Sequence, residues 1–152
     1  MIYRLIIFLV LNFGALALGG IFTSKGVSSI WYTSIAKAPW TPPGWVFGAA
    51  WTLIMICFTV YMAYAWPLIE NKKLLLGLYV TQWILNVGWN PIFFYYHQVF
   101  AGLLTISALT ALVGLMLFFY WTDMKLASIL IVPYLIWLII ATSLNYFIYL
   151  KN

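Results

Sequence analysis

The sequence predicts an all-α membrane protein, folded as a compact bundle of five transmembrane helices. Of its 152 residues, 66% are hydrophobic and only 6% are charged, whereas a soluble domain averages roughly 25% charged residues. The apolar residues form five long runs, each close to the ~20 residues that a helix needs to cross a bilayer. These runs do not alternate between polar and apolar residues, as the strands of a membrane barrel would.

We expect the membrane spans at residues 3–23, 44–66, 74–95, 100–121 and 128–149. The connections are short except the first, so neighbouring helices should be antiparallel and residues 1–152 should form a single domain. The apolar run after Arg4 is too long for a typical secretory signal, and we interpret it as the first span. The net charge of +5 comes from few charged residues. We interpret it as a bias at the membrane flanks, with no nucleic-acid partner.

Small side chains mark the first predicted span. Ala15 and Gly19 are four residues apart, a spacing that lets another backbone approach closely. The approaching partner is either a neighbouring helix or a second protomer, and we favour the neighbouring helix. The connection that follows, about 24–43, is long enough to be a lid over an opening in the bundle. An aromatic belt at the membrane interface is the alternative interpretation.

A proline-rich turn, KAPWTPPGWVFGAAW at residues 37–51, leads into the second span. Thr41 is a suitable N-cap, and Pro42 would then occupy the first helical position. The helix carries one apolar stripe, which is typical of core packing: Trp51, Met55, Phe58 and Met62. Trp51 differs from the rest because a buried indole N–H needs a hydrogen-bond partner.

The third span presents polar groups on one helical face. The face consists of Gln82, Asn86, Trp89, Asn90 and Phe93. Unpaired polar groups are costly in hydrocarbon, so this face should point into the bundle. It serves either to join helices or to supply the polar anchors of a mostly apolar ligand pocket. The nearby Pro91 would leave the carbonyl of Val87 without its helical donor.

The fourth and fifth spans carry fewer signals. Small residues from Ala101 to Gly114 suit tight packing or a protomer contact. Pro133 should kink the fifth span and free the carbonyl of Ile129. One stripe of this helix contains Pro133, Tyr134, Trp137, Ala141 and Asn145. His97, the only histidine, lies in a short loop, where we expect an ordinary interfacial residue and no haem ligand.

Several classes of function lack the residues they need. No Asp, Glu, Lys, Arg or His lies in the middle of a span, which argues against ion-coupled transport. No catalytic triad, paired carboxylates, metal-ligand cluster or phosphate loop is present, so no metal is expected. Any chemistry would depend on aromatic side chains and a reactive ligand.

Four runs of residues resemble the TspO/MBR family, which comprises bacterial tryptophan-rich sensory proteins and the mitochondrial translocator protein (peripheral benzodiazepine receptor). They are Trp31-Tyr32, KAPWTPPGWVFGAAW at 37–51, LNVGWNPIFF at 85–94 and PYLIWLIIATSLNY at 133–146. The resemblance implies five transmembrane helices, a homodimer and a pocket under the first loop. It also implies binding of protoporphyrin IX and related tetrapyrroles, of benzodiazepine-type drugs and, in some members, of cholesterol. No resident cofactor is implied.

The resemblance also assigns roles to residues of this chain. The ligand-binding residues would be Tyr32, Phe47, Trp51, Asn86, Trp89, Trp137, Ala141 and Leu144. A sterol-contact motif would consist of Leu144, Tyr146 and Lys151. Some bacterial members degrade protoporphyrin IX in light, and there Trp51 and Trp137 would be the catalytic residues.

We therefore expect a tetrapyrrole-binding receptor or sensor whose partners are membrane lipid and porphyrin. Sterol is a further candidate partner. The alternatives are a light-dependent porphyrin-degrading enzyme, a porphyrin or sterol transporter, and a helical scaffold without a cavity. We expect a multi-pass protein of the bacterial cytoplasmic membrane in preference to the outer membrane.

Overall fold

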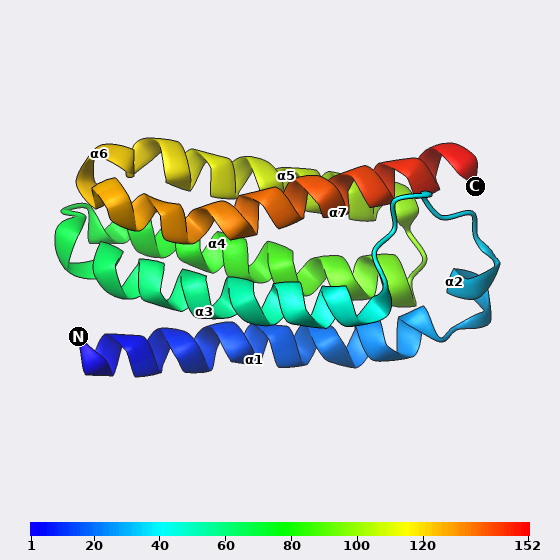
Figure 1. Ribbon diagram of the computed structural model, residues 1–152, viewed down its shortest axis with the longest axis horizontal. Helices are drawn as coiled ribbons and strands as arrows, with labels where there is room; N and C mark the ends of the chain where they lie inside the picture. Colours follow the sequence, from blue (N-terminus) through cyan, green and yellow to red (C-terminus); the bar gives the residue numbers. More distant parts are fainter.

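The computed structural model describes all 152 residues, which form helices and no strands. The long helices lie side by side with successive helices antiparallel, and the two termini lie at opposite ends of the bundle (Figure 1). In chain order the elements are α1 (Ile2–Val27), α2 (Ile30–Ser34), α3 (Gly44–Leu68), α4 (Lys72–Asn90), the π-helical turn η1 (Pro91–Tyr95), α5 (Val99–Phe119), α6 (Trp121–Met124), the 3-10 helix η2 (Lys125–Ile131) and α7 (Val132–Lys151).

Four helical segments are long and apolar enough to cross a bilayer: Ile2–Val27, Gly44–Leu68, Val99–Phe119 and Trp121–Lys151. The helix α4 is not among them. Two lysines at its start and three amide side chains along it make it the most polar of the long helices. The all-α bundle of apolar helices agrees with the sequence prediction, and four of the five predicted spans meet the requirement for length and composition.

The start of α3 corrects the expected N-cap. The helix begins at Gly44 after Pro43, and the Thr41 hydroxyl donates to the carbonyl of Ala38 at 2.7 Å instead of capping the helix. The reason is that a residue before proline is disfavoured in the helical region. Pro43 therefore disfavours Pro42 in the helix, and Pro43 itself is the N-cap with ψ 150°, so the first helical residue is Gly44.

The α-helix of the last span begins at Val132 and not at residue 128, because residues 125–131 form a 3-10 helix. Pro133 lies in the first turn of α7, where a missing N–H leaves no bond unmade. The amide of Val132 donates to the carbonyl of Ile129. The predicted free carbonyl is therefore wrong, and Pro133 lies in the first turn of α7 instead of inside a longer α-helix.

The half of the bundle nearest the N-terminus is solid core. Met55, Phe58 and Met62 are buried there, as the stripe predicted. A polar trio ties three helices together at this level: Asn12 Nδ2 donates to Thr59 Oγ1 at 3.0 Å, and the Tyr79 hydroxyl donates to Asn12 Oδ1 at 2.7 Å. Because these groups satisfy one another away from water, they hold α1, α3 and α4 in one register. The other half of the bundle is left to enclose a cavity.

Candidate functional site

A cavity of ≈ 570 Å³ opens between the helices at the end of the bundle that α2 covers. Its volume lies within the range of roughly 300–1,000 Å³ typical of small-molecule sites. The 23 lining residues come from α1, α2, the loop after α2, α3, α4, η1, α5 and α7. The site is thus assembled from nearly every element of the fold.

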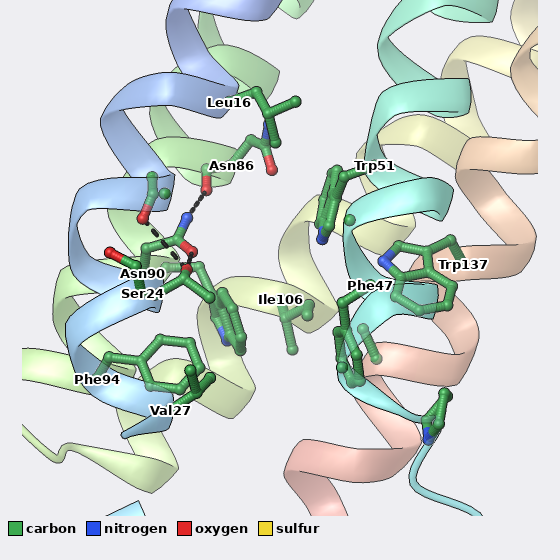
Figure 2. A pocket seen from close by; sticks show the side chains of 18 of the residues that line it. Leu16, Ser24, Val27, Phe47, Trp51, Asn86, Asn90, Phe94, Ile106 and Trp137 are labelled. Carbon is green, nitrogen blue, oxygen red and sulfur yellow. Dashed lines mark hydrogen bonds between the residues drawn. The ribbon is translucent and has the colours of Figure 1, made fainter. Parts of the chain in front are cut away.

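Aromatic side chains form the wall that α3 and α7 contribute. Figure 2 shows Phe47, Trp51 and Trp137 on this side of the cavity. The rings of Phe47 and Trp137 meet edge to face, with centroids 5.3 Å apart and planes at 83°. Trp51 packs in the same way on Tyr134, with centroids 6.0 Å apart. Edge-to-face pairs of this kind fix ring orientation, so the wall is preorganised.

The indole N–H of Trp137 has no partner within the chain. The side chain is only 6% exposed, and its Nε1 is buried without a hydrogen bond. In Figure 2 this nitrogen lies on the side of the ring nearer Trp51. A buried donor without an acceptor is costly.

The facing wall is polar and comes from α1 and α4 (Figure 2). Thr23 Oγ1 donates to Asn90 Oδ1 at 2.6 Å, and Asn90 Nδ2 donates to the carbonyl of Asn86 at 2.9 Å. The same Nδ2 lies 3.4 Å from the carbonyl of Val87. This is the carbonyl that Pro91 deprives of a backbone donor, so the Asn90 amide replaces the missing N–H. The polar face predicted on the third span therefore faces the interior.

Trp89 of α4 lines the cavity, and its indole N–H already has a partner. Its Nε1 donates to Asn145 Oδ1 at 3.1 Å, and Asn145 Nδ2 donates to the carbonyl of Val99 at 3.1 Å. Its ring stacks on Phe93 with planes at 13° and centroids 5.2 Å apart. Trp89 is therefore held rigidly and offers the cavity a ring face and no free donor.

The roof of the cavity is α2 with the loop after it, and it includes Tyr32, Lys37 and Thr41. Tyr32 packs on Phe94 with ring centroids 5.5 Å apart, and Lys37 Nζ lies 4.9 Å from the centroid of the Tyr32 ring. Burial raises the pKa of the Tyr32 phenol, so it stays neutral at physiological pH. The roof thus presents the neutral phenol of Tyr32, with the Lys37 ammonium lying over the face of the Tyr32 ring.

Side chains of α7 hold the roof loop in place. The carboxamide of Asn152 pairs with the backbone of Ala36, accepting its N–H at 2.9 Å and donating to its carbonyl at 3.1 Å. Trp40 Nε1 donates to Ser143 Oγ at 3.1 Å, and the Trp40 ring packs edge to face on Phe147. We call these contacts of Asn152 and Trp40 the roof latch. They support the lid interpretation of the first loop.

On the other side of α2, the rings of Trp31 and His97 stack with centroids 4.2 Å apart. His97 is exposed and has a positive φ of 55°. It lies outside the lining of the cavity and serves to dock α2 on the end of η1.

The structure brings together seven of the eight expected ligand-binding residues. Those lining the cavity are Tyr32, Phe47, Trp51, Asn86, Trp89, Trp137 and Ala141. The eighth, Leu144, is buried at 8% exposure but does not line the cavity. Tyr146 is 51% exposed and Lys151 is also exposed. Residues two apart on a helix differ by roughly 200° in direction, so Leu144 and Tyr146 point to different sides of α7.

The whole α1 wall, together with Phe94 and Ile106, was not predicted to line the site. The missed residues of α1 are Ala15, Leu16, Gly19, Gly20, Thr23, Ser24 and Val27. Ala15, Gly19, Thr23 and Val27 recur at intervals of four, which is the signal that one helical face would give. Their small size leaves the space that the larger rings of α3 and α7 do not fill.

The fold and the cavity define a small, multi-pass helical membrane protein with a ligand-sized chamber between its helices. The chain belongs to the TspO/MBR family, whose sequence profile it matches over residues 6–150. It is 37% identical over 135 residues to the tryptophan-rich protein TspO of Archaeoglobus fulgidus, covering 88% of this chain and 87% of that one. It is 34% identical over 139 residues to protein CrtK of Rhodobacter capsulatus, covering 90% and 84%. It is 31% identical over 126 residues to the translocator protein of Homo sapiens, covering 80% and 75%.

Proposed function

We propose that this protein is an integral membrane receptor or sensor that binds protoporphyrin IX or a related tetrapyrrole in the cavity under α2. The observation that carries the proposal is the division of the cavity, with Trp51 and Trp137 on one wall and Asn86 and Asn90 on the other. A tetrapyrrole is a flat aromatic disc with polar edges. Aromatic faces would hold its plane and amides would orient its edges.

The mouth of the cavity suits the acidic groups of such a ligand. Lys37 lies in the roof and lines the cavity. Its only hydrogen bond is to the carbonyl of Ile35, at 3.2 Å, and no acidic side chain lines the cavity. A propionate at the mouth would pair with this ammonium near the membrane surface, where the interaction is screened and modest.

We propose that α4 is the fifth transmembrane helix. Its polar residues Gln82 and Asn86 are buried, whereas Leu76, Val80 and Ile84 on its other side are 45–59% exposed. A helix that hides its amides and shows aliphatic side chains can lie in lipid despite a polar composition. Lys72 and Lys73 at its start suit a headgroup layer. With α4 included, the protein would have five spans. We also propose that it is a homodimer in a bacterial cytoplasmic membrane.

The test is a protoporphyrin IX titration of the purified protein in detergent, first in the dark and then in light. Saturable quenching of tryptophan fluorescence in the dark is the expected result. Quenching that rises linearly without saturation, equal to that of free tryptophan, would contradict a binding site. The matched variants are Trp51→Phe in the cavity and Trp45→Phe at a site that is 75% exposed and outside it.

The second candidate function is light-dependent degradation of the bound porphyrin. It is favoured by the position of Trp51 and Trp137, which both line the cavity and would both contact the disc. Light would supply the energy and dissolved oxygen would be the oxidant, so no general base is needed. In that case the porphyrin absorption band would decay faster on the protein than in free solution, and Trp51→Phe or Trp137→Phe would remove the difference.

Benzodiazepine-type drugs and sterols are further candidate ligands of the same cavity. Displacement of bound protoporphyrin by each would place them there, and a lack of displacement would restrict the cavity to tetrapyrroles. A transport role is a separate matter, suggested by the name translocator protein that the human relative carries. Flux of porphyrin across liposomes containing the protein would test it.

A further inference from the structure

A second, shallower hollow lies on the outside of the bundle. It is a groove of ≈ 350 Å³ between α3 and the segment where η2 passes into α7. Seven of its eight lining residues are hydrophobic and the remaining one is Pro133. Leu53, Ile129 and Ile136 on its rim are 54–59% exposed. Because α3 and the segment containing α7 are long and apolar enough to span a bilayer, this groove opens toward hydrocarbon.

Trp137 is the one residue that lines both this groove and the central cavity. Its indole therefore forms part of the partition between the cavity and the lipid. The small side chain of Ala50 deepens the groove on the α3 side. Thus one side chain, that of Trp137, borders both the cavity and the groove at this place.

The two ways into the cavity differ in what must break. The roof is closed by the latch, in which Asn152 makes two hydrogen bonds to Ala36 and Trp40 makes one to Ser143. The Trp137 indole makes no hydrogen bond at all. Turning it breaks only its packing, such as the edge-to-face contact with Phe47. The roof hydrogen bonds are exposed, so water can replace them when the roof opens. The two routes therefore differ in the medium that they connect to the cavity, which is water at the roof and hydrocarbon at the groove.

We propose that the groove between α3 and α7 is a lateral port, through which the ligand moves between the bilayer and the cavity. The Trp137 side chain separates the port from the cavity and must turn aside for the ligand to pass. The occupant in transit is a flat, mostly apolar molecule that partitions into the bilayer, with its acidic groups at the headgroup layer. Such a ligand is concentrated in the membrane and reaches the groove without crossing water. The port rests on the proposed function for the identity of the ligand, protoporphyrin IX, but not for its own existence.

Rates of ligand exchange test the port. The protein is placed in vesicles, protoporphyrin IX is added in the lipid phase, and association and dissociation are followed by quenching of tryptophan fluorescence. Ala50→Phe fills the groove, and Ala49→Phe, one residue away and lining neither hollow, is its control. A blocked path raises one barrier for both directions. We therefore expect both rates to fall at least about fivefold in Ala50→Phe, with an unchanged Kd, and to stay as in the wild type in Ala49→Phe.

A second pair protects the test against misfolding of the first. Ile136→Trp covers the groove, and Ile139→Trp is its control on the same helix, at 55% exposure against 54%. Equal exchange rates in Ile136→Trp and Ile139→Trp would overturn the port. Faster exchange in Asn152→Ala, with no effect of groove filling, would assign entry to the roof instead.

A further measurement does not need the porphyrin. Lipids brominated in mid-chain quench any tryptophan that the hydrocarbon reaches. The emission of Trp137 is obtained by subtracting the spectrum of the same protein with Trp137→Phe, and this is done separately in Ala49→Phe and in Ala50→Phe. We expect the Trp137 emission to be quenched in Ala49→Phe and protected in Ala50→Phe. Equal quenching in the two variants would contradict hydrocarbon access through the groove. If the wild type binds no protoporphyrin IX but Ala50→Phe still protects Trp137 from quenching, the proposed function fails while the port stands.

Discussion

The side-chain amide of Asn90 occupies the space above Gly19. A Cβ added to Gly19 would lie 2.6 Å from Asn90 Nδ2, closer than unbonded heavy atoms approach. The absence of a side chain on α1 therefore lets α4 place its amide against the α1 backbone. There Asn90 accepts from Thr23 and donates to the carbonyl of Asn86. The small residue predicted to contact a neighbour does so within the chain.

Gly19→Ala should therefore destabilise the protein. The added methyl group would displace the Asn90 amide and break the network of the polar wall, at a cost of about 1–3 kcal/mol in the free energy of unfolding. The control is Gly14→Ala on the same helix, where nothing lies within 4 Å of the added Cβ. This control should be stabilised by about 0.5–1 kcal/mol, as for any glycine in a helix interior. Thermal unfolding in detergent gives both values, and equal melting temperatures would contradict the close approach.

Tyr79→Phe should loosen the closed half of the bundle. The change removes the hydroxyl that donates to Asn12 Oδ1 and leaves a buried acceptor unpaired, which costs about 1–3 kcal/mol. Tyr64→Phe removes a hydroxyl from a side chain that is 42% exposed and should change the free energy of unfolding by less than about 0.5 kcal/mol. Denaturant unfolding compares the two variants. A loss of stability in Tyr64→Phe as large as that in Tyr79→Phe would show that the polar trio is not responsible.

Trp51→Phe and Trp137→Phe should each weaken binding of protoporphyrin IX in the dark. Each substitution reduces the aromatic face available to the ligand, and Trp137→Phe also removes the unpaired indole N–H. We expect a loss of about 1 kcal/mol for each, roughly a fivefold increase in Kd. Fluorescence titration measures it, with Trp45→Phe as the control outside the cavity. Wild-type affinity in both cavity variants would exclude this wall as the ligand contact.

Asn152→Ala should release the roof loop without unfolding the bundle. The N–H of Ala36 loses its acceptor, Asn152 Oδ1, so hydrogen exchange at this amide should accelerate about tenfold or more. The global free energy of unfolding should change by less than about 0.5 kcal/mol, because the contact lies at the exposed end of α7. Lys151→Ala, also exposed, is the control. Unchanged exchange at Ala36 would mean that the latch does not restrain the loop.

Residue periodicity in the sequence was sufficient to predict the long helices and the face that one of them buries. The apolar runs predicted the long helices, and the face containing Gln82 and Asn86 was placed correctly in the interior. The sequence-based prediction failed on the N-cap of α3 and on the first residue of α7. Helix ends depend on a few neighbouring residues, such as the pair Pro42-Pro43, whose steric conflict outweighed the capping preference of Thr41.

By itself the sequence determined that this chain is a bundle of apolar helices and that it belongs to the TspO/MBR family. Both follow from local patterns, because hydropathy and helical period are fixed by residues close together in the chain. Only the tertiary structure decided that α1 supplies one wall of the cavity, that Leu144 lies outside it and that Trp137 borders a second hollow. These depend on which helical faces meet. Thr23 and Asn90 are 67 residues apart, and only the packing of α1 against α4 brings them within hydrogen-bonding distance.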